Sequence, residues 1–292
     1  MMDLPMPECL VDIPCGIGEN PLWHPDEQRI YWTDISGQRL YRCAADGDVL
    51  ESFEVPSPVG GFTVQEDGAL ALFMGGGAVR IWRDGQFLET IMETVPGEED
   101  GRFNDVIAGI DGSVYCGTMS TGAHAGRFYR LHTDRRLERL VEGMGTPNGM
   151  GYSPDRRWFY QNDSRLAVMY RWAHDPATGD IHDRQVLIDV DKREGVGRPD
   201  GMIVDAEGFL WTARWDGHRV IRHSPDGIPV AEMVFPTARN VSSLTLAGPD
   251  MTMAFVTTAA CGDRERNGPE GGALFVVKHC PVHGQAEFRS RL

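Results

Sequence analysis

Short runs of β-branched and aromatic residues alternate with turns along the whole chain, in a unit that recurs six times. Each unit opens on a turn that carries Asp or Glu and continues into two apolar runs, such as RIYWTDI and RLYRC after Asp26. Gly, Asp and Pro occupy the joints, which is typical of strands connected by tight turns. No apolar period of 3.6 residues is sustained, so the pattern predicts strands rather than helices.

The spacing of the units predicts a β-propeller. The acidic turn residues recur every 41 to 52 residues and are Asp26, Asp67, Asp111, Asp155, Glu207 and Asp250. Six units of about 49 residues fill the 292-residue chain, and strand pairs at such a period are typical of propeller blades. We therefore expect an all-β protein in which residues 1–292 form a single domain, a six-bladed β-propeller with four antiparallel strands per blade.

Closing such a ring requires one blade that is built from both ends of the chain. Residues 8–13 (ECLVDI) form a candidate strand that can join the C-terminal apolar run at residues 273–278. Ring closure removes exposed sheet edges, which would otherwise pair with other chains. We therefore predict that the N- and C-terminal strands close the ring.

Composition and charge exclude several classes of partner. The net charge is −15, from 28 Lys and Arg against 43 Asp and Glu, and such a field repels nucleic acid and anionic membranes. No apolar run approaches the roughly 18 residues of a membrane span, and residues 1–10 lack the basic segment that opens a secretory signal. Six cysteines without a C-x-x-C pair predict reduced thiols. We expect a cytoplasmic protein with no nucleic-acid, membrane or obligate protein partner.

One position of the repeat carries an oxygen-bearing side chain in most copies. It lies seven residues before the acidic turn residue and is occupied by Glu19, Gly60, Asn104, Asn148, Asp200 and Ser243. If each stretch from this position to its turn is an innermost strand, all six positions lie at one end of the central channel. N-G and D-G dipeptides also occur in ordinary hairpin turns. A turn role would explain each dipeptide on its own, but not why the polar residues share one position of the repeat. The pattern therefore predicts a polar site on the propeller axis.

Three of these residues form a candidate metal site. Glu19, Asn148 and Asp200 offer two carboxylates and an amide carbonyl, which are hard oxygen ligands suited to Ca²⁺, Mg²⁺ or Mn²⁺. Neighbouring Gly and Pro residues permit close backbone approach and stiffen the loops. We expect one divalent cation on the axis, with Ca²⁺ as the first candidate ahead of Zn²⁺, Mn²⁺, Mg²⁺ and Fe²⁺.

Several segments are similar to the gluconolactonase/regucalcin family, also called the SMP-30 family. They are GENPLWHPDEQRIYWTDI, RFNDV with the later GSVYCGTM, TPNGMGYSPD, and RPDGMIVDAEGFLWTA, in the family's order along nearly the whole chain. The resemblance implies a six-bladed propeller with one divalent cation on its axis. It also implies hydrolysis of aldonolactones and related cyclic esters.

The resemblance assigns roles to single residues. The family's metal ligands fall on Glu19, which stands in G-E-N-P where the family has G-E-G-P, and on Asn148 and Asp200. Arg102 and Asn104 match residues that hold substrate oxygens, and Asn104 could also reach the metal, directly or through water. Some members carry an acidic substrate residue just after G-T-M, where this chain reads S-T-G. The resemblance therefore leaves the preferred sugar open.

These residues predict metal-dependent hydrolysis of a sugar lactone, such as a glucono- or xylonolactone, to the aldonic acid. The cation would polarise the carbonyl, and Arg102 would hold substrate oxygens by charge-assisted hydrogen bonds. Asp200 is the candidate catalytic base; hydroxide on the cation, with Asp200 as a ligand only, is the alternative. Two other functions stay open: a non-catalytic calcium-binding or scaffold propeller, and a hydrolase of a non-sugar lactone or ester.

Other patterns indicate no further function. The nine histidines show no metalloprotease spacing and no shared position in the repeat. His124 and His218 could border the pocket, although structural roles are favoured. The single Y-W-T-D segment at residues 31–34 is weak evidence for an extracellular receptor propeller, because it occurs once and without disulfides.

Overall fold

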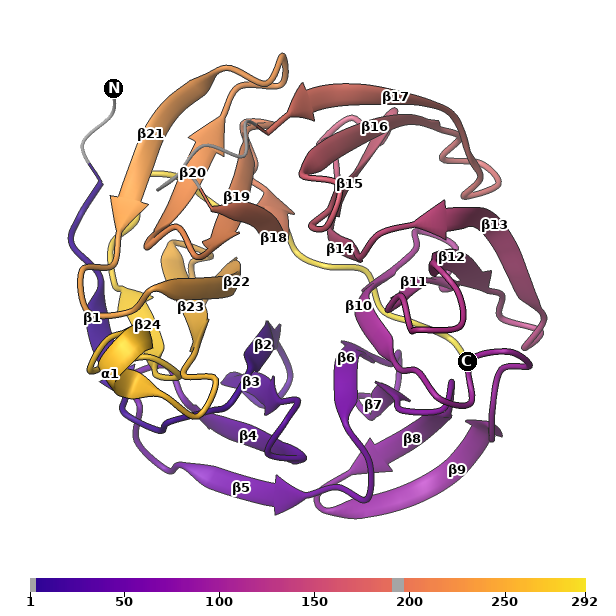
Figure 1. The fold of residues 1–292 in the computed structure, drawn as a ribbon, viewed down its shortest axis with the longest axis horizontal. Coiled ribbons are helices and arrows are strands. Elements are labelled where there is room, and N and C mark those ends of the chain that lie inside the picture. The colour runs from indigo at the N-terminus through magenta and orange to yellow at the C-terminus, as the bar shows by residue number, and fades with distance from the viewer. Residues whose placement is uncertain (1–3, 191–196) are drawn as a thin grey trace.

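Six four-stranded antiparallel sheets stand around a central axis in the computed structural model, which describes residues 4–190 and 197–292. Figure 1 shows the sheets arranged as the blades of a ring, so the predicted all-β six-bladed propeller is confirmed. The only helix among the described residues is the short α1 (Arg264–Asn267). None of the described helices is long and apolar enough to cross a membrane.

Five blades are consecutive in the chain, with their strands in chain order from the axis outward. Blade 1 contains β2 (Gly18–His24), β3 (Arg29–Asp34), β4 (Arg39–Ala44) and β5 (Glu51–Glu54). Blade 2 contains β6 (Val59–Val64), β7 (Leu70–Met74), β8 (Val79–Arg83) and β9 (Gln86–Met92). Blade 3 contains β10 (Phe103–Ala108), β11 (Val114–Thr118), β12 (Gly126–Leu131) and β13 (Leu137–Met144).

The remaining blades complete the ring. Blade 4 contains β14 (Pro147–Tyr152), β15 (Trp158–Asp163), β16 (Val168–His174) and β17 (Ile181–Asp189). Blade 5 contains β18 (Arg198–Val204), β19 (Leu210–Trp215), β20 (Arg219–His223) and β21 (Pro229–Val234). Blade 6 contains β22 (Asn240–Ala247), β23 (Met253–Ala259), β24 (Leu274–Val277) and, as its outermost strand, β1 (Glu8–Val11).

Blade 6 is the closing blade that the sequence predicted. β1 pairs antiparallel with β24, with Glu8 opposite Val276 and Val11 opposite Leu274. The two ends of the chain thus share one sheet. The strand ends two residues before the predicted residue 13, but the predicted closure of the ring by N- and C-terminal strands is confirmed.

Burial follows distance from the axis. Every residue of the inner strands β6, β14 and β22 is buried, whereas the outer strands β9 and β17 are largely exposed. The core lies between the faces of neighbouring blades, as where Trp211 of blade 5 packs in one cluster with Val241 and Phe275 of blade 6. Burial of such apolar surface stabilises the blade-to-blade contacts by roughly 25 cal/mol per Å².

The C-terminal residues 283–292, here called the strap, cross the end of the channel at which the inner strands finish. Residues 284–291 hydrogen-bond to all six blades through Met251, Val204, Tyr152, Val64, Asp26 and Gly112. Figure 1 shows the strap in yellow across the middle of the ring. The strap is therefore a second closing device, which ties the blades together without adding a strand.

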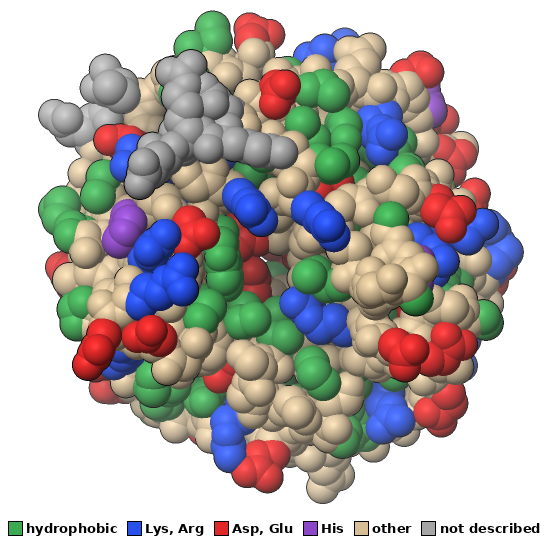
Figure 2. Space-filling view, viewed as in Figure 1, with side chains coloured by type: hydrophobic (Ala, Val, Ile, Leu, Met, Phe, Trp, Pro, Cys, Tyr) green, Lys and Arg blue, Asp and Glu red, His purple; other side chains and the backbone are tan. Residues whose placement is uncertain are grey.

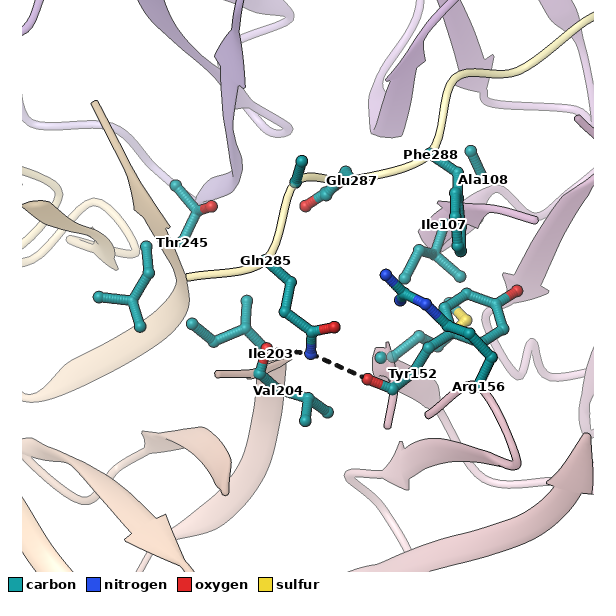
Figure 3. Close-up of a pocket in the computed structure, with 14 residues that line it drawn as sticks. Ile107, Ala108, Tyr152, Arg156, Ile203, Val204, Thr245, Gln285, Glu287 and Phe288 are labelled. Carbon is teal, nitrogen blue, oxygen red and sulfur yellow. Dashed lines mark hydrogen bonds between the residues drawn. The ribbon is translucent and has the colours of Figure 1, made fainter. Parts of the chain in front are cut away.

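Gln285 holds the centre of the strap. Its side-chain amide donates to the carbonyl oxygens of Tyr152 (3.2 Å), Val204 (3.0 Å) and Asp205 (3.1 Å), and so joins blades 4 and 5 (Figure 3). Glu287, two residues later, lines a small pocket together with Asp105. Desolvation by the surrounding groups, and then the nearby Asp105, raise the pKa of Glu287 from 4.5 to about 7.

This raised pKa predicts a pH-dependent effect of Glu287→Gln. Between about pH 4.5 and pH 7 the Glu287 carboxyl group stays protonated in the folded protein but ionises in the unfolded chain. Its contribution therefore makes the fold less stable as the pH rises through this range. The variant should melt at a higher temperature than the parent at about pH 8 and at the same temperature at about pH 4. Differential scanning calorimetry across this range measures the difference, and Glu93→Gln, at an exposed site, is the control. A constant offset at all pH values would contradict the prediction.

Candidate functional site

A pocket of about 240 Å³ lies in the channel at the end opposite the strap. All five residues that the sequence singled out line it: Glu19, Arg102, Asn104, Asn148 and Asp200. Figure 2, which views this end, shows acidic side chains inside the central opening and basic side chains at its rim. The predicted convergence of these side chains on the axis is therefore found in the structure.

Two of the six equivalent positions do not contribute to this pocket. Ser243 lies deeper in the channel, where it lines a smaller cavity with Asp105 and Glu287. Gly60 brings no side chain, and a Cβ there would stand 2.0 Å from the Phe103 carbonyl oxygen. Gly60 is required because the inner strands of blades 2 and 3 approach each other closely at this point.

A break in strand register occurs at this end of every inner strand. All six inner strands shift register against their neighbours, within residues 19–22, 59–61, 103–106, 148–150, 199–202 and 241–243. A bulge inserts extra residues into one strand and re-aims its side chains. The break falls at or beside each position of the polar set, which places the polar side chains at the mouth of the channel.

Aspartates at the ends of second strands hold the loops that lead to two site residues. Asp34, at the end of β3, accepts hydrogen bonds of 3.0 Å from two backbone N–H groups of the loop before Glu19. Asp163, at the end of β15, accepts bonds of 2.8 and 2.9 Å from the loop before Asn148. Asp34, the aspartate of the Y-W-T-D segment, thus holds a loop in place in this chain.

Asn148 and Asp200 are in direct contact in the lining of the pocket. The Asn148 side-chain amide donates to Asp200 and to the Ser164 hydroxyl, the latter at 3.1 Å. Gly149, the residue after Asn148, has a φ of 24°, and a Cβ at this position would lie 2.4 Å from the Asp200 carbonyl oxygen. Only glycine allows blades 4 and 5 to bring these two side chains together in this way.

The electrostatics of the pocket fit a divalent cation. Burial, then the charge of Asp200, raises the pKa of Glu19 well above its ordinary value; burial and Asp105 do the same to Asp200. A cation would offset both the desolvation and the repulsion of these carboxylates. Within residues 4–190 and 197–292, three His, Cys, Asp or Glu side chains nowhere converge on a shared ion site. A cation here would therefore depend on the amide oxygen of Asn148 as well as on Glu19 and Asp200.

Arg102 and Asn104 form the wall next to the carboxylates. The Arg102 guanidinium donates to the Asn104 amide oxygen (2.9 Å) and to the Phe103 carbonyl (2.8 Å). The Asn104 amide nitrogen donates to the Pro147 carbonyl, 3.0 Å away and one residue before Asn148. Asn104 therefore orients Arg102 and ties blade 3 to the strand that carries Asn148. Burial lowers the pKa of Arg102, and the charges of the two carboxylates oppose that shift.

Seven residues that the sequence analysis did not assign to the site also line the pocket. They are Ile17, Ile35, Met119, Thr146, Ser164, Arg198 and Trp215. Three of them stand two positions before a member of the polar set, as does Arg102. Because side chains two apart point to the same side of a strand, this step was a usable signal. The other four stand at or just after the end of a second strand, which is another position shared by the repeats.

The fold and the pocket define a six-bladed propeller with a polar pocket in its central channel. The profile of the SMP-30/Gluconolactonase/LRE-like region matches residues 17–260, and the chain belongs to this family. The chain is 39% identical to the pentonolactonase XacC of Haloferax volcanii, over 96% of this chain and 97% of that protein. It is 33% identical to the L-arabinolactonase of Azospirillum brasilense, over 92% and 90% of the two chains.

Solved structures show the same fold. A luciferin-regenerating enzyme superposes with a TM-score of 0.88 at 23% identity, covering 98% of this chain and 100% of that chain. The regucalcin of Agrobacterium tumefaciens, described as a calcium-binding protein, superposes with a TM-score of 0.85 at 24% identity, covering 99% and 98%. At these identities the likeness supports the architecture alone.

The site predicts one cation-binding event per chain that depends on Glu19 and Asp200. Calorimetric titration of chelated protein with Ca²⁺ should fit one site, and Glu19→Gln or Asp200→Asn should weaken affinity by roughly tenfold or more, because each removes a charged ligand. Glu287→Gln, deeper in the same channel, should leave the affinity unchanged. At a hundredfold excess over Kd the cation should stabilise the fold by about 2.7 kcal/mol. Binding that persists in both ligand variants would contradict this ligand set.

Proposed function

We propose that this protein is a divalent-metal-dependent lactonase that opens a sugar lactone to the aldonic acid. The convergence of two carboxylates, an amide and an arginine in one open pocket is the observation that carries the proposal. Similarity to two relatives named as lactonases, at 39% and 33% identity, supports the reaction class. A binding or scaffold role alone would not require Arg102 and Asn104 to face the carboxylates.

The five polar residues of the pocket divide between them the binding of the cation, the binding of substrate and the transfer of a proton. Glu19, Asn148 and Asp200 would hold the cation, which when bound would polarise the lactone carbonyl. Arg102 holds substrate oxygens by charge-assisted hydrogen bonds, and Asn104 keeps the guanidinium aimed into the pocket. Asp200 accepts the proton of the attacking water at a carboxylate oxygen, and the Asn148 amide holds this carboxylate in place.

A five-carbon aldonolactone is the first substrate to test. Two relatives carry names that specify five-carbon lactones, the pentonolactonase and the L-arabinolactonase. A third, the 6-deoxy-6-sulfogluconolactonase of Pseudomonas putida, is 32% identical over 94% of this chain and 92% of that protein. We infer that the ring of the sugar lactone fills the pocket, and not a long acyl chain. Hexonolactones are the second class of substrate to test.

The deciding experiment is a pH-stat screen of pentono- and hexonolactones with chelated and metal-reconstituted protein. Hydrolysis should require the reconstituted protein and should be fastest with a pentonolactone. Cation binding without hydrolysis of any lactone would favour the calcium-binding or scaffold alternative. Hydrolysis of non-sugar lactones or esters alone would keep the reaction class and replace the substrate.

Asp200→Asn tests the role of this residue as base. Asparagine keeps the shape and one carbonyl oxygen but removes the basic carboxylate. If Asp200 is the base, kcat should fall by roughly 10²–10⁴ even at metal concentrations that restore full occupancy. The measurement is kcat against metal concentration, with bound metal determined in the same samples. Near-complete recovery of kcat at full occupancy would show that Asp200 acts only as a ligand.

A further inference from the structure

Glu98 is a fully buried carboxylate that has no part in the proposed metal site. It lies in the segment between β9 and β10, and its side chain is 0% exposed. One carboxylate oxygen accepts three hydrogen bonds, from the Thr118 hydroxyl (3.1 Å), the Arg127 guanidinium (2.9 Å) and the Tyr129 hydroxyl (2.8 Å). A buried charge is retained in a fold only when it is paired and hydrogen-bonded in this manner.

The partners of Glu98 are direct neighbours of two residues that line the pocket. Thr118, which its carboxylate binds, precedes Met119, and Gly101, whose N–H donates to the Glu98 carbonyl at 2.9 Å, precedes Arg102. The Met119 N–H in turn donates to the Arg102 carbonyl at 3.1 Å. The Glu98 carboxylate therefore fixes the segment that presents Met119 to the pocket. Arg102 is tied to that segment by the Met119 N–H and to the Glu98 backbone through Gly101, so the carboxylate acts on Arg102 through Met119.

The second carboxylate oxygen of Glu98 faces the loop that follows Met119. Among the described residues this buried oxygen has no hydrogen-bond partner, and His124 Nε2 lies 3.6 Å from it. His124 Nδ1 is 2.7 Å from the Ala125 carbonyl, so Nδ1 carries a proton. The loop is closed on itself by a bond of 2.9 Å from the Thr121 N–H to the His124 carbonyl. Loop 119–125 thus rests on Glu98 through the His124 ring.

We propose that Glu98 is a positioning residue for substrate binding. Its carboxylate sets the place of Met119 and loop 119–125, and that of Arg102 through Met119. The proposal rests on the proposed function, since it takes Arg102 as the group that holds the lactone. In this proposal the wall of the pocket depends on Glu98. The proposed metal ligands stand on β2, β14 and β18 and do not contact Glu98.

Asp205 provides a matched control at the other end of the propeller. It is also a fully buried carboxylate, and it accepts hydrogen bonds from the Arg222 guanidinium (2.7 and 2.9 Å) and the Trp211 indole (2.8 Å). It follows β18 at the strap end, where Gln285 contacts its carbonyl. Loss of either carboxylate leaves buried donors without a partner, so both variants lose stability, but only one of them lies beside the pocket.

The test compares Glu98→Ala, Asp205→Ala and Arg102→Ala by steady-state kinetics on the best lactone, with metal content measured. Glu98→Ala should raise KM roughly tenfold with kcat within about threefold, as expected when an interaction equal in ground and transition states is lost. Arg102→Ala should show the same direction of change. Asp205→Ala should lower the melting temperature without changing KM. Full metal occupancy is expected in all three.

Two milder variants cover the case in which Glu98→Ala does not fold. Glu98→Gln keeps the shape and an acceptor oxygen and should give a KM between those of the parent and the alanine variant. Thr118→Val removes the hydroxyl, which donates to Glu98 and accepts from the Arg127 N–H, and should raise KM in the same direction. An unchanged KM in these variants, or an equal rise in Asp205→Ala, would overturn the proposal.

A readout independent of catalysis separates this proposal from the proposed function. Hydrogen–deuterium exchange should become faster in peptides that cover residues 99–104 and 119–125 in Glu98→Gln, but not in Asp205→Asn. If the parent hydrolyses no lactone, the proposed function fails while this local effect still decides whether Glu98 holds the two segments. Exchange that is unchanged there would overturn the positioning role even in an active enzyme.

Discussion

The ring forces side chains from four separate blades to meet on one axis, and the rest of the structure depends on this convergence. Two carboxylates, Glu19 and Asp200, are brought into one pocket, where burial and the repulsion of neighbouring carboxylates oppose their ionisation. Such an arrangement is unfavourable in a bare protein and becomes favourable when a cation is held between the groups. The cation that we propose for this site would offset a cost that the fold itself creates.

The ring can carry that cost because it is closed twice. The pairing of β1 with β24 joins the ends of the chain within one sheet, and the strap hydrogen-bonds to every blade at the far end of the channel. Figure 2 shows an opening at the opposite end of the channel, where Arg102 and the carboxylates line the pocket.

Much of this arrangement could be predicted from the sequence, because it follows from repetition. The strand pairs, the closing strand and the five polar residues of the pocket all lie at positions that recur with the blades. The strap could not be predicted, since residues 283–292 have no periodic pattern and their partners are spread over all six blades. Glu98 was missed for a similar reason: its burial comes from Thr118, Arg127 and Tyr129, which lie 20 to 31 residues away. The roles of the site residues in metal and substrate binding stay predictions.

The same repetition separates the polar set from the walls of the pocket. The polar set occupies a strand position at which bulges and glycines such as Gly149 leave little freedom for change. The walls of the pocket come instead from residues two positions earlier and from the ends of second strands, where apolar, basic and aromatic side chains all occur in this chain, as Ile17, Arg198 and Trp215 show. Changes at these wall positions alter shape and charge without moving the carboxylates. Substrate preference in this protein should therefore be sought in the walls, and in groups such as Glu98 that hold them, more than in the residues on the axis.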